Sequence, residues 1–166
     1  MIELNSLSQE EAQRLLYACF ASQKWARRVV EERPYADVRA LLDAAERAWS
    51  ELEPPDWTEA LAGHPRIGER GGSSPAASER EQGSVRKAPA DTIAQLADEN
   101  RRYEARFGHV FLISAAGRSA DDILAALRER MENDAVTEAR VAAAEHRKIA
   151  RKRLEALFPS PRRGEG

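Results

Sequence analysis

Hydrophobic residues recur at helical spacing along most of the chain, and capping residues, glycines and prolines mark where the pattern breaks. Ser8-Gln9-Glu10-Glu11 has capping-box spacing and opens the first predicted helix. Its inward positions are Ala12, Leu15, Leu16, Cys19 and Phe20. Further helices are predicted from Ser22 to before Pro34, over 37–49, over 91–107, over 119–131 and over 134–158. Pro54-Pro55 separates the third helix from a short one through Trp57 and Leu61 that Gly63 stops.

Two stretches do not follow the helical pattern. Residues 68–78 are rich in glycine and contain a proline, which predicts a loop, either a plain surface connection or a lid over a site. Residues 109–117 are apolar and short, and predict a buried extended segment or a short helix. We therefore expect one all-α domain, a helical bundle over 1–158, followed by a disordered tail over 159–166.

Composition narrows the class of protein. The chain has 166 residues, 33% of them charged, and a formal net charge of −2, which suits one folded domain and gives no general attraction to nucleic acid or membranes. The single cysteine, Cys19, lies in an apolar stripe, and neither a secretory signal nor an apolar run of ~18 residues is present. We expect a cytoplasmic protein.

The run Leu61-Ala62-Gly63-His64-Pro65-Arg66-Ile67-Gly68 carries the first candidate for chemistry. A helix-stopping glycine and a φ-fixing proline flank His64, so its imidazole is held on a stiff backbone. Because the unperturbed pKa of histidine lies near neutrality, a rigidly held imidazole is suited to proton transfer. The alternative is a histidine that caps a helix end or is satisfied in the core.

Arg153 is the second candidate, because it falls within an apolar helical stripe. Burial of a guanidinium is costly without a partner, so this position requires an acidic side chain or an anionic ligand. Two partners are equally consistent with a buried arginine here: a ligand carboxylate bound through two hydrogen bonds, or an acidic side chain of another helix in a salt bridge. The stripe is formed by Ala142, Ile149, Ala156 and Leu157.

Other polar residues carry weaker signals. Ser78-Glu79-Arg80-Glu81-Gln82 sets a carboxylate beside a carboxamide, which suits an amide-rich or ureido ligand but equally a solvated helix start. Asn100 shares the face of Ile93, Ala97 and Phe107, and is expected to be satisfied by a neighbouring backbone. The three histidines lack metal-ligand spacing, and no phosphate-binding glycine motif is present, so no metal site is predicted.

Taken together with three further blocks, the His64 run resembles one family. The blocks are Ser78-Glu79-Arg80-Glu81-Gln82, the stretch from Asn100 to Ile113, and the stretch from Glu145 to Leu154. Over about residues 6–158 the chain resembles 2-oxo-4-hydroxy-4-carboxy-5-ureidoimidazoline (OHCU) decarboxylase. Ser114 stands where a cysteine is frequent in that family, and Gly83-Ser84-Val85 is shorter than the usual run.

The resemblance implies an all-helical fold, usually dimeric, that decarboxylates OHCU to (S)-allantoin without a cofactor. It implies that His64 is the catalytic imidazole and that Glu81 and Gln82 bind the ring and ureido groups. The remaining substrate-binding positions that it implies are Pro65, Ser78, the backbone of Phe111 and Ile113, and Arg153. Two rival functions are a non-catalytic helical interaction module, which would show an exposed apolar groove, and another lyase or hydrolase acting on a related ring.

Overall fold

The computed structural model describes residues 3–64, 85, 87–115 and 117–160. Within these ranges the ordered elements are helices and no strand is present, so the all-α prediction is confirmed. The chain divides into two compact units, Met1–Ala60 with Ala150–Gly166 (unit 1) and Leu61–Ile149 (unit 2). Helices α4 (Pro54–Ala62) and α9 (Ala135–Leu157) each contribute residues to both units.

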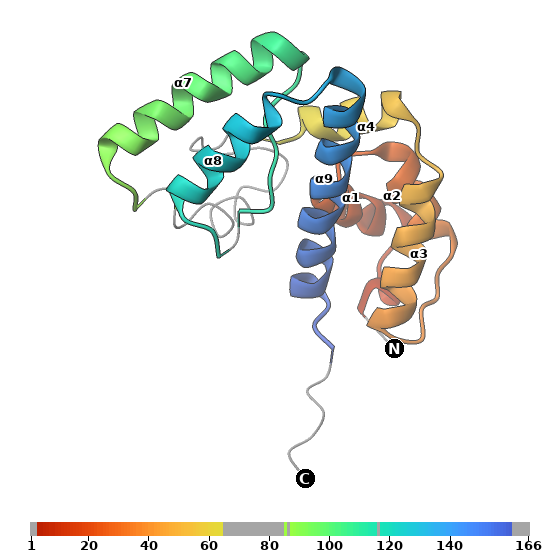
Figure 1. The fold of residues 1–166 in the computed structure, drawn as a ribbon. Coiled ribbons are helices and arrows are strands. Elements are labelled where there is room, and N and C mark those ends of the chain that lie inside the picture. Colours follow the sequence, from red (N-terminus) through yellow and green to blue (C-terminus); the bar gives the residue numbers. More distant parts are fainter. Residues whose placement is uncertain (1–2, 65–84, 86, 116, 161–166) are drawn as a thin grey trace. The chain divides into compact units, whose positions relative to one another are not determined.

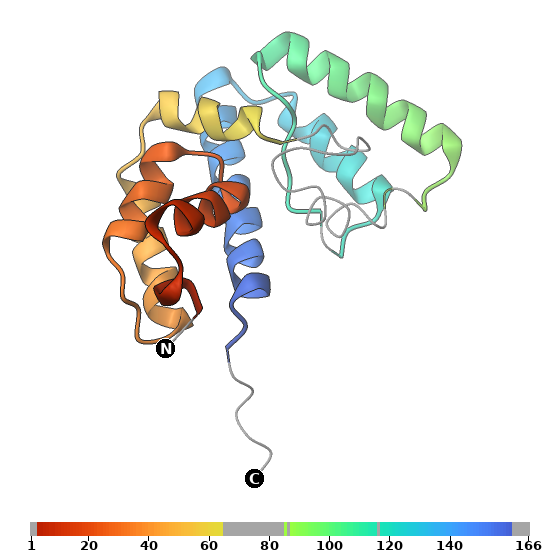
Figure 2. The same cartoon turned by 180° about the vertical axis from the view of Figure 1, so that it is seen from behind.

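Unit 1 contains a short 3-10 helix, Glu3–Ser6, and helices α1 (Gln9–Cys19), α2 (Gln23–Glu31) and α3 (Val38–Ser50). Ser8 forms the predicted capping box with Glu11, and Ser22 and Asp37 cap α2 and α3. Helix α2 packs against both α1 and α3 (Figures 1 and 2). The predicted starts of these three helices are therefore confirmed.

The interior of unit 1 is built around aromatic rings. The rings of Trp25 and Trp49 are stacked with centroids 5.3 Å apart, and Phe20 meets both edge-on. The indole nitrogen of Trp25 donates to the Ala45 carbonyl at 3.2 Å, so its one polar atom is satisfied. Cys19 is buried in the same cluster, as its apolar neighbours predict.

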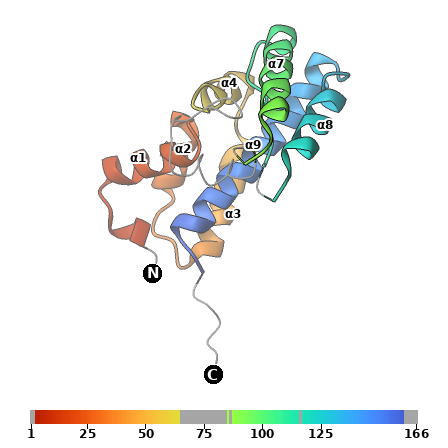
Figure 3. The same cartoon turned by 90° about the vertical axis from the view of Figure 1, so that its left-hand side faces the viewer.

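Unit 2 contains α7 (Ala90–Phe107), α8 (Ala120–Arg130) and the first part of α9, with α7 packed against α8 (Figure 3). Gly108 ends α7 with a φ of 79°, in the left-handed region that glycine adopts without strain. The capping box of Ser119 and Asp122 starts α8, and the Asp134 carboxylate accepts the Thr137 amide at the start of α9.

Some details of the predicted apolar faces are wrong. Ala156 is exposed, and Leu157 is 45% exposed, although the sequence pattern predicts both in the buried stripe of the last helix. Ala97 of α7 is also exposed. Which side of a helix is buried depends on the elements that cover it, and the pattern within one helix does not specify them. Between α7 and α8 the apolar segment 110–115 has no regular structure, so it does not form a short helix. Residues 111–115 of this segment are buried, and Val110 is half-buried.

Candidate functional site

His64 directly follows the C-terminal end of α4. The Glu53 amide donates to the Asp56 carboxylate at 3.0 Å, which stabilises the start of this helix. At the other end, the His64 amide donates to the Leu61 carbonyl at 3.0 Å. The imidazole is half-buried, and Leu61 is buried with Leu112 and Ile149 in one apolar cluster of unit 2. A helix end and a packed leucine thus fix the backbone that carries His64.

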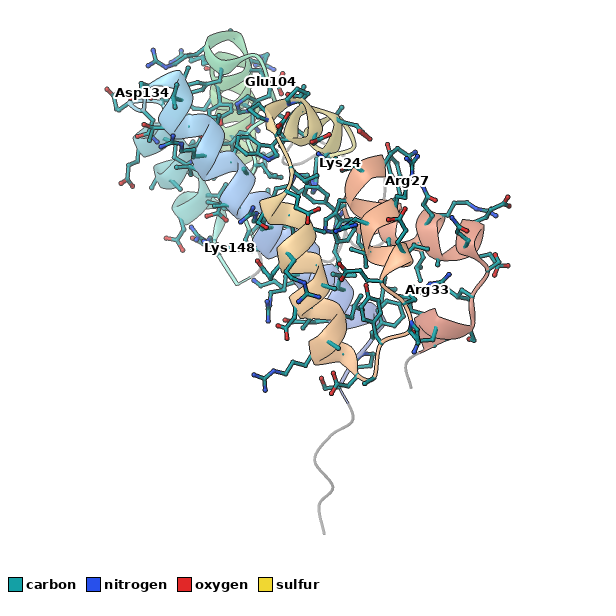
Figure 4. All side chains as sticks on the ribbon, turned by 90° about the vertical axis from the view of Figure 1, so that its right-hand side faces the viewer. Lys24, Arg27, Arg33, Glu104, Asp134 and Lys148 are labelled. Atoms are coloured by element: carbon teal, nitrogen blue, oxygen red, sulfur yellow. The ribbon has the colours of Figure 1, made fainter. Side chains whose placement is uncertain are left out.

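A second imidazole, that of His146 on α9, lies against His64. The centroids of the two rings are 4.5 Å apart and the ring planes cross at 82°, an edge-to-face arrangement. His146 is only 2% exposed. The sequence interpretation missed this residue, although its spacing from Ala142 and Ile149 puts it on their face of the helix. Lys148 of the same helix is exposed to solvent and forms an ion pair with Glu145 at 3.3 Å (Figure 4).

The irregular segment 110–115 is held by side chains from two helices of unit 2. The Ser114 amide donates to Oε2 of Glu145 on α9 at 3.0 Å, and the Leu112 carbonyl accepts from Nη1 of Arg130 on α8 at 2.6 Å. The side chains of Phe111 and Ile113 are 1% and 3% exposed and pack in the core. Any contact that these two residues make with a substrate therefore comes from their backbone.

A buried ionic network of Arg130, Glu138 and Tyr103 contacts this segment through Arg130. Glu138 is 0% exposed, and its carboxylate accepts from the Arg130 guanidinium at 2.7 Å, from the Tyr103 hydroxyl at 2.5 Å and from the Asn133 amide at 3.0 Å. The Arg130 guanidinium also lies over the Phe111 ring, 4.6 Å from its centroid. Burial, and then the hydrogen bond to Glu138, raises the pKa of the Tyr103 hydroxyl far above its usual range.

Arg153 lies in unit 1 and is 5% exposed, so its predicted burial is confirmed. Its Nη1 donates to the carbonyls of Ala18 and Cys19 at the C-terminal end of α1, at 3.4 and 3.5 Å. A guanidinium is favourable there because helix C-terminal carbonyls carry partial negative charge. Main-chain carbonyls were not among the partners that the sequence predicted. That Arg153 and His64 bind one substrate stays a prediction.

Four predicted substrate-binding residues, Pro65, Ser78, Glu81 and Gln82, lie outside the described residues, as does the predicted loop 68–78. Asn100 is 2% exposed, and its side-chain Nδ2 has no hydrogen-bond partner among the described residues, contrary to the expectation that a backbone group satisfies it. His109 packs against Tyr103 and Phe107 rather than against His64.

Neither a metal-binding group nor a membrane-spanning helix is present in the part of the chain that the structure describes. It contains no group of three or more His, Cys, Asp or Glu side chains able to hold a metal ion. In the same residues, no helix combines the length and apolar content that crossing a bilayer requires. Among the described residues, His64 and His146 place a fixed imidazole beside a second, buried imidazole, an arrangement that suits proton transfer.

Comparison with known protein families identifies a match over nearly the whole chain. The family model described as OHCU decarboxylase matches residues 5–155 and so includes residues of both units. The curated relatives include the uric acid degradation bifunctional protein TTL of Arabidopsis thaliana, 32% identical over 84% of this chain and 45% of that protein. Another is the uric acid degradation bifunctional protein of Bacillus sp. (strain TB-90), 26% identical over 94% of this chain and 32% of that protein. The chain spans less than half the length of these relatives.

Two solved structures resemble the fold. A crystal structure of OHCU decarboxylase in the presence of (S)-allantoin has a TM-score of 0.76 and 29% identity, covering 87% of this chain and 97% of that chain. A crystal structure of (S)-allantoin synthase has a TM-score of 0.71 at 19% identity, covering 94% of this chain and 52% of that chain. The second likeness supports the fold alone. Together with the family match, the comparisons confirm a single all-α family domain.

Proposed function

This chain belongs to the OHCU decarboxylase family, and we propose that it converts OHCU to (S)-allantoin and CO2 in urate degradation. The observation that carries this proposal is the family match over residues 5–155, because it includes His64, the segment 110–115 and Arg153. The two-imidazole arrangement of His64 and His146 supplies a group suited to the proton transfers that the reaction requires.

The reaction breaks the bond between the ring carbon and its carboxylate. The electron pair of that bond forms a double bond between the two ring carbons as CO2 leaves, the carbon–nitrogen double bond becomes single, and its nitrogen takes up a proton. The hydroxyl group on the same ring carbon then loses its proton and becomes a carbonyl, while the neighbouring carbon, which carries the ureido group, gains a proton. The enzyme must stabilise the charge that develops on the ring and deliver the proton to one face.

His64 acts in this scheme as the proton-transfer group. Its imidazole accepts the proton of the substrate hydroxyl as CO2 departs, which assists formation of the carbonyl. The position of His64 at a fixed helix end supports this role, because a general base must be held within hydrogen-bond reach of the proton that it removes.

The substrate-binding roles follow the family motifs. Glu81 orients the ring nitrogens or His64, and Gln82 binds the ureido or ring amides. Arg153 pairs with an anionic oxygen of the substrate, for which a buried guanidinium is well suited. The further positions are Pro65 and Ser78, which line the pocket, and the backbone of Phe111 and Ile113.

Product stereochemistry tests the proposed function. Freshly oxidised urate is supplied to the protein, and the product is followed by circular dichroism. An unguided carbanion is protonated on either face, whereas catalysis by this protein is expected to give a growing signal of (S)-allantoin. A protein that produces no chiral allantoin is instead an interaction module. One that consumes a related ring without forming allantoin is a different lyase or hydrolase.

We also propose that the protein is a homodimer that acts in the cytoplasm on this small molecule alone, without nucleic acid, a membrane surface, a cofactor or a metal. The family resemblance supports the dimer. The near-neutral charge supports action without nucleic acid or a membrane surface, and the single cysteine supports a cytoplasmic location. Light scattering coupled to size-exclusion chromatography tests the assembly, for which a mass twice that of one chain is expected.

A further inference from the structure

We propose that His146 is a positioning residue for the reaction, one that orients the His64 imidazole through the edge-to-face ring contact. This inference rests on the proposed function, since it assumes that His64 transfers the proton. The observation behind it is the separation of 4.5 Å between the two ring centroids, with ring planes at 82°. The family motifs that assign the substrate-binding residues give His146 no role.

The helix end fixes the backbone of His64, and the contact with His146 adds a restraint on its ring. Rotation about the bond that joins a histidine ring to its Cβ is broad, and a half-turn exchanges the two ring nitrogens. His64 is half-buried and lies beyond the last turn of α4, so local backbone geometry does not select one ring orientation. A flat ring packed edge-to-face restricts that rotation and so holds the plane in which the His64 nitrogens face the substrate.

His146 is itself well fixed. It is 2% exposed and lies within the long helix α9. Its neighbour Glu145 accepts the Ser114 amide at 3.0 Å, and Ile149, one turn further, packs with Leu61 and Leu112. Leu61 in turn accepts the His64 amide. The stretch 145–149 of α9 therefore contacts both the backbone that carries His64 and the ring of His64.

Ring-retaining and ring-removing substitutions separate orientation from simple packing. His146→Phe keeps a flat aromatic ring but no nitrogen, whereas His146→Ala and His146→Leu remove the ring, the latter at similar volume. A ring misplaced by about 1 Å is expected to lower kcat about 10²-fold, and we expect this loss in both ring-removing variants, with KM unchanged. His146→Phe is expected to retain most of the wild-type kcat.

His109→Ala is the matched control. It also removes an imidazole that packs on aromatic rings of unit 2, with centroids 5.5 Å from Tyr103 and 6.3 Å from Phe107. We expect its kcat to stay at the wild-type value after correction for folded protein by far-UV circular dichroism. If His146→Ala does not fold, His146→Leu provides the same comparison, because it leaves no comparable cavity.

A double-variant experiment tests whether His146 acts through His64. In a His64→Asn background, His146→Ala is expected to cause no further loss, because the group that it orients is already absent. An equal loss in both backgrounds would overturn the inference, as would a His146→Phe variant as slow as His146→Ala, or a raised KM with normal kcat. These results leave the proposed function intact. A wild-type protein that forms no (S)-allantoin contradicts the proposed function itself.

Discussion

The two units of the molecule differ in what they bury. Among the described residues, unit 1 buries an apolar interior centred on Phe20, Trp25 and Trp49, with Ser22 and Arg153 as its buried polar residues. Unit 2 buries a larger share of polar side chains. These are Asn100, Ser114, Arg130, Glu138 and His146.

This difference indicates that unit 1 mainly stabilises the fold, whereas unit 2 carries the polar groups suited to catalysis. Apolar burial stabilises a fold at about 25 cal/mol per Å², whereas buried charges cost free energy unless they are well paired. Unit 2 contains both the imidazole pair and the ionic network, and that network holds the Leu112 carbonyl within the proposed substrate-binding segment. We therefore expect substitutions in unit 1 to act on stability, and those at the imidazoles of unit 2 to act on catalysis.

The largest expected effect is that of His64→Asn. It removes the proposed proton-transfer group and should lower kcat about 10²- to 10⁴-fold, the usual contribution of general acid–base catalysis. The helical content should stay unchanged, because His64 follows α4 rather than forming part of it. Stopped-flow measurement of (S)-allantoin formation checks the rate, and far-UV circular dichroism checks the fold. A variant with a near-normal rate would remove His64 from the mechanism.

Arg130→Met should have the largest effect on stability within unit 2. It leaves the Glu138 carboxylate, which is 0% exposed, without its counter-charge, and breaking a buried pair in this way costs about 3–5 kcal/mol. Urea unfolding gives the free energy of unfolding. The triple variant Arg130→Met, Glu138→Leu, Tyr103→Phe removes the paired charges and the hydroxyl together, and should recover part of the loss.

Failure of the triple variant to recover any stability would show that the Arg130 hydrogen bond to the Leu112 carbonyl, at 2.6 Å, outweighs the ion pair. An unchanged stability of Arg130→Met would contradict the network as a stabilising feature of unit 2.

Trp49→Ala is the corresponding change in unit 1. Trp49 is 1% exposed and stacks on Trp25, so truncation leaves a large cavity and should cost about 3–5 kcal/mol. The kcat per folded molecule should stay at the wild-type value, with active protein counted from the folded fraction in the same unfolding experiment. A Trp49→Ala protein that is stable but slow would contradict the proposed division between the units.

Much of the fold could be predicted from the sequence because local signals agree. The capping boxes at Ser8 and Ser119, the caps at Ser22 and Asp37 and the stop at Gly108 are each set by residues within one helical turn. The errors at Ala97, Ala156 and Leu157 arose where burial depends on which other element covers the helix. No pattern within a single helix contains that information.

Less of the candidate site than of the fold could be predicted from the sequence. His64 could be found because Gly63 and Pro65 mark a fixed position, and burial of Arg153 follows from its helical face. His146 lies on the same face of the last helix as Arg153, but from the sequence alone it is weighed only as a metal ligand. Its contact with His64 joins residues 82 positions apart, and so depends on tertiary packing alone. The burial of Glu138 with Arg130 likewise requires two helices to meet.

Arg153→Lys tests the exception in unit 1, a buried charge in an otherwise apolar interior. A lysine keeps the positive charge but cannot reproduce the planar fork of the guanidinium. If Arg153 binds the substrate, the loss of one charged hydrogen bond, about 1.5–3 kcal/mol, should raise KM roughly 10- to 100-fold with a smaller change in kcat. Steady-state kinetics measures both constants. Unchanged kinetics with lowered stability would give Arg153 a structural role, as in its hydrogen bonds to the Ala18 and Cys19 carbonyls.

The smallest expected effect is a pH dependence in unit 1. Burial, reinforced by the charge of Glu32, raises the pKa of the Tyr35 hydroxyl from 10.0 to about 12. Between those pH values the folded state keeps a proton that the unfolded state has lost. The free energy of unfolding therefore falls as pH rises, by at most about 1.4 kcal/mol per pH unit for one such group.

Tyr35→Phe isolates this contribution. The variant loses the hydrogen bond from the hydroxyl to the Val29 carbonyl, at 2.5 Å, and should be less stable than the wild type at pH 8. Its stability should then fall less steeply above pH 10, because the raised pKa of Tyr103 in unit 2 still contributes while that of Tyr35 does not. Urea unfolding of both proteins across this range gives the two slopes. Equal slopes would show that ionisation of Tyr35 is not linked to folding, and that the alkaline loss of stability originates in the polar interior of unit 2.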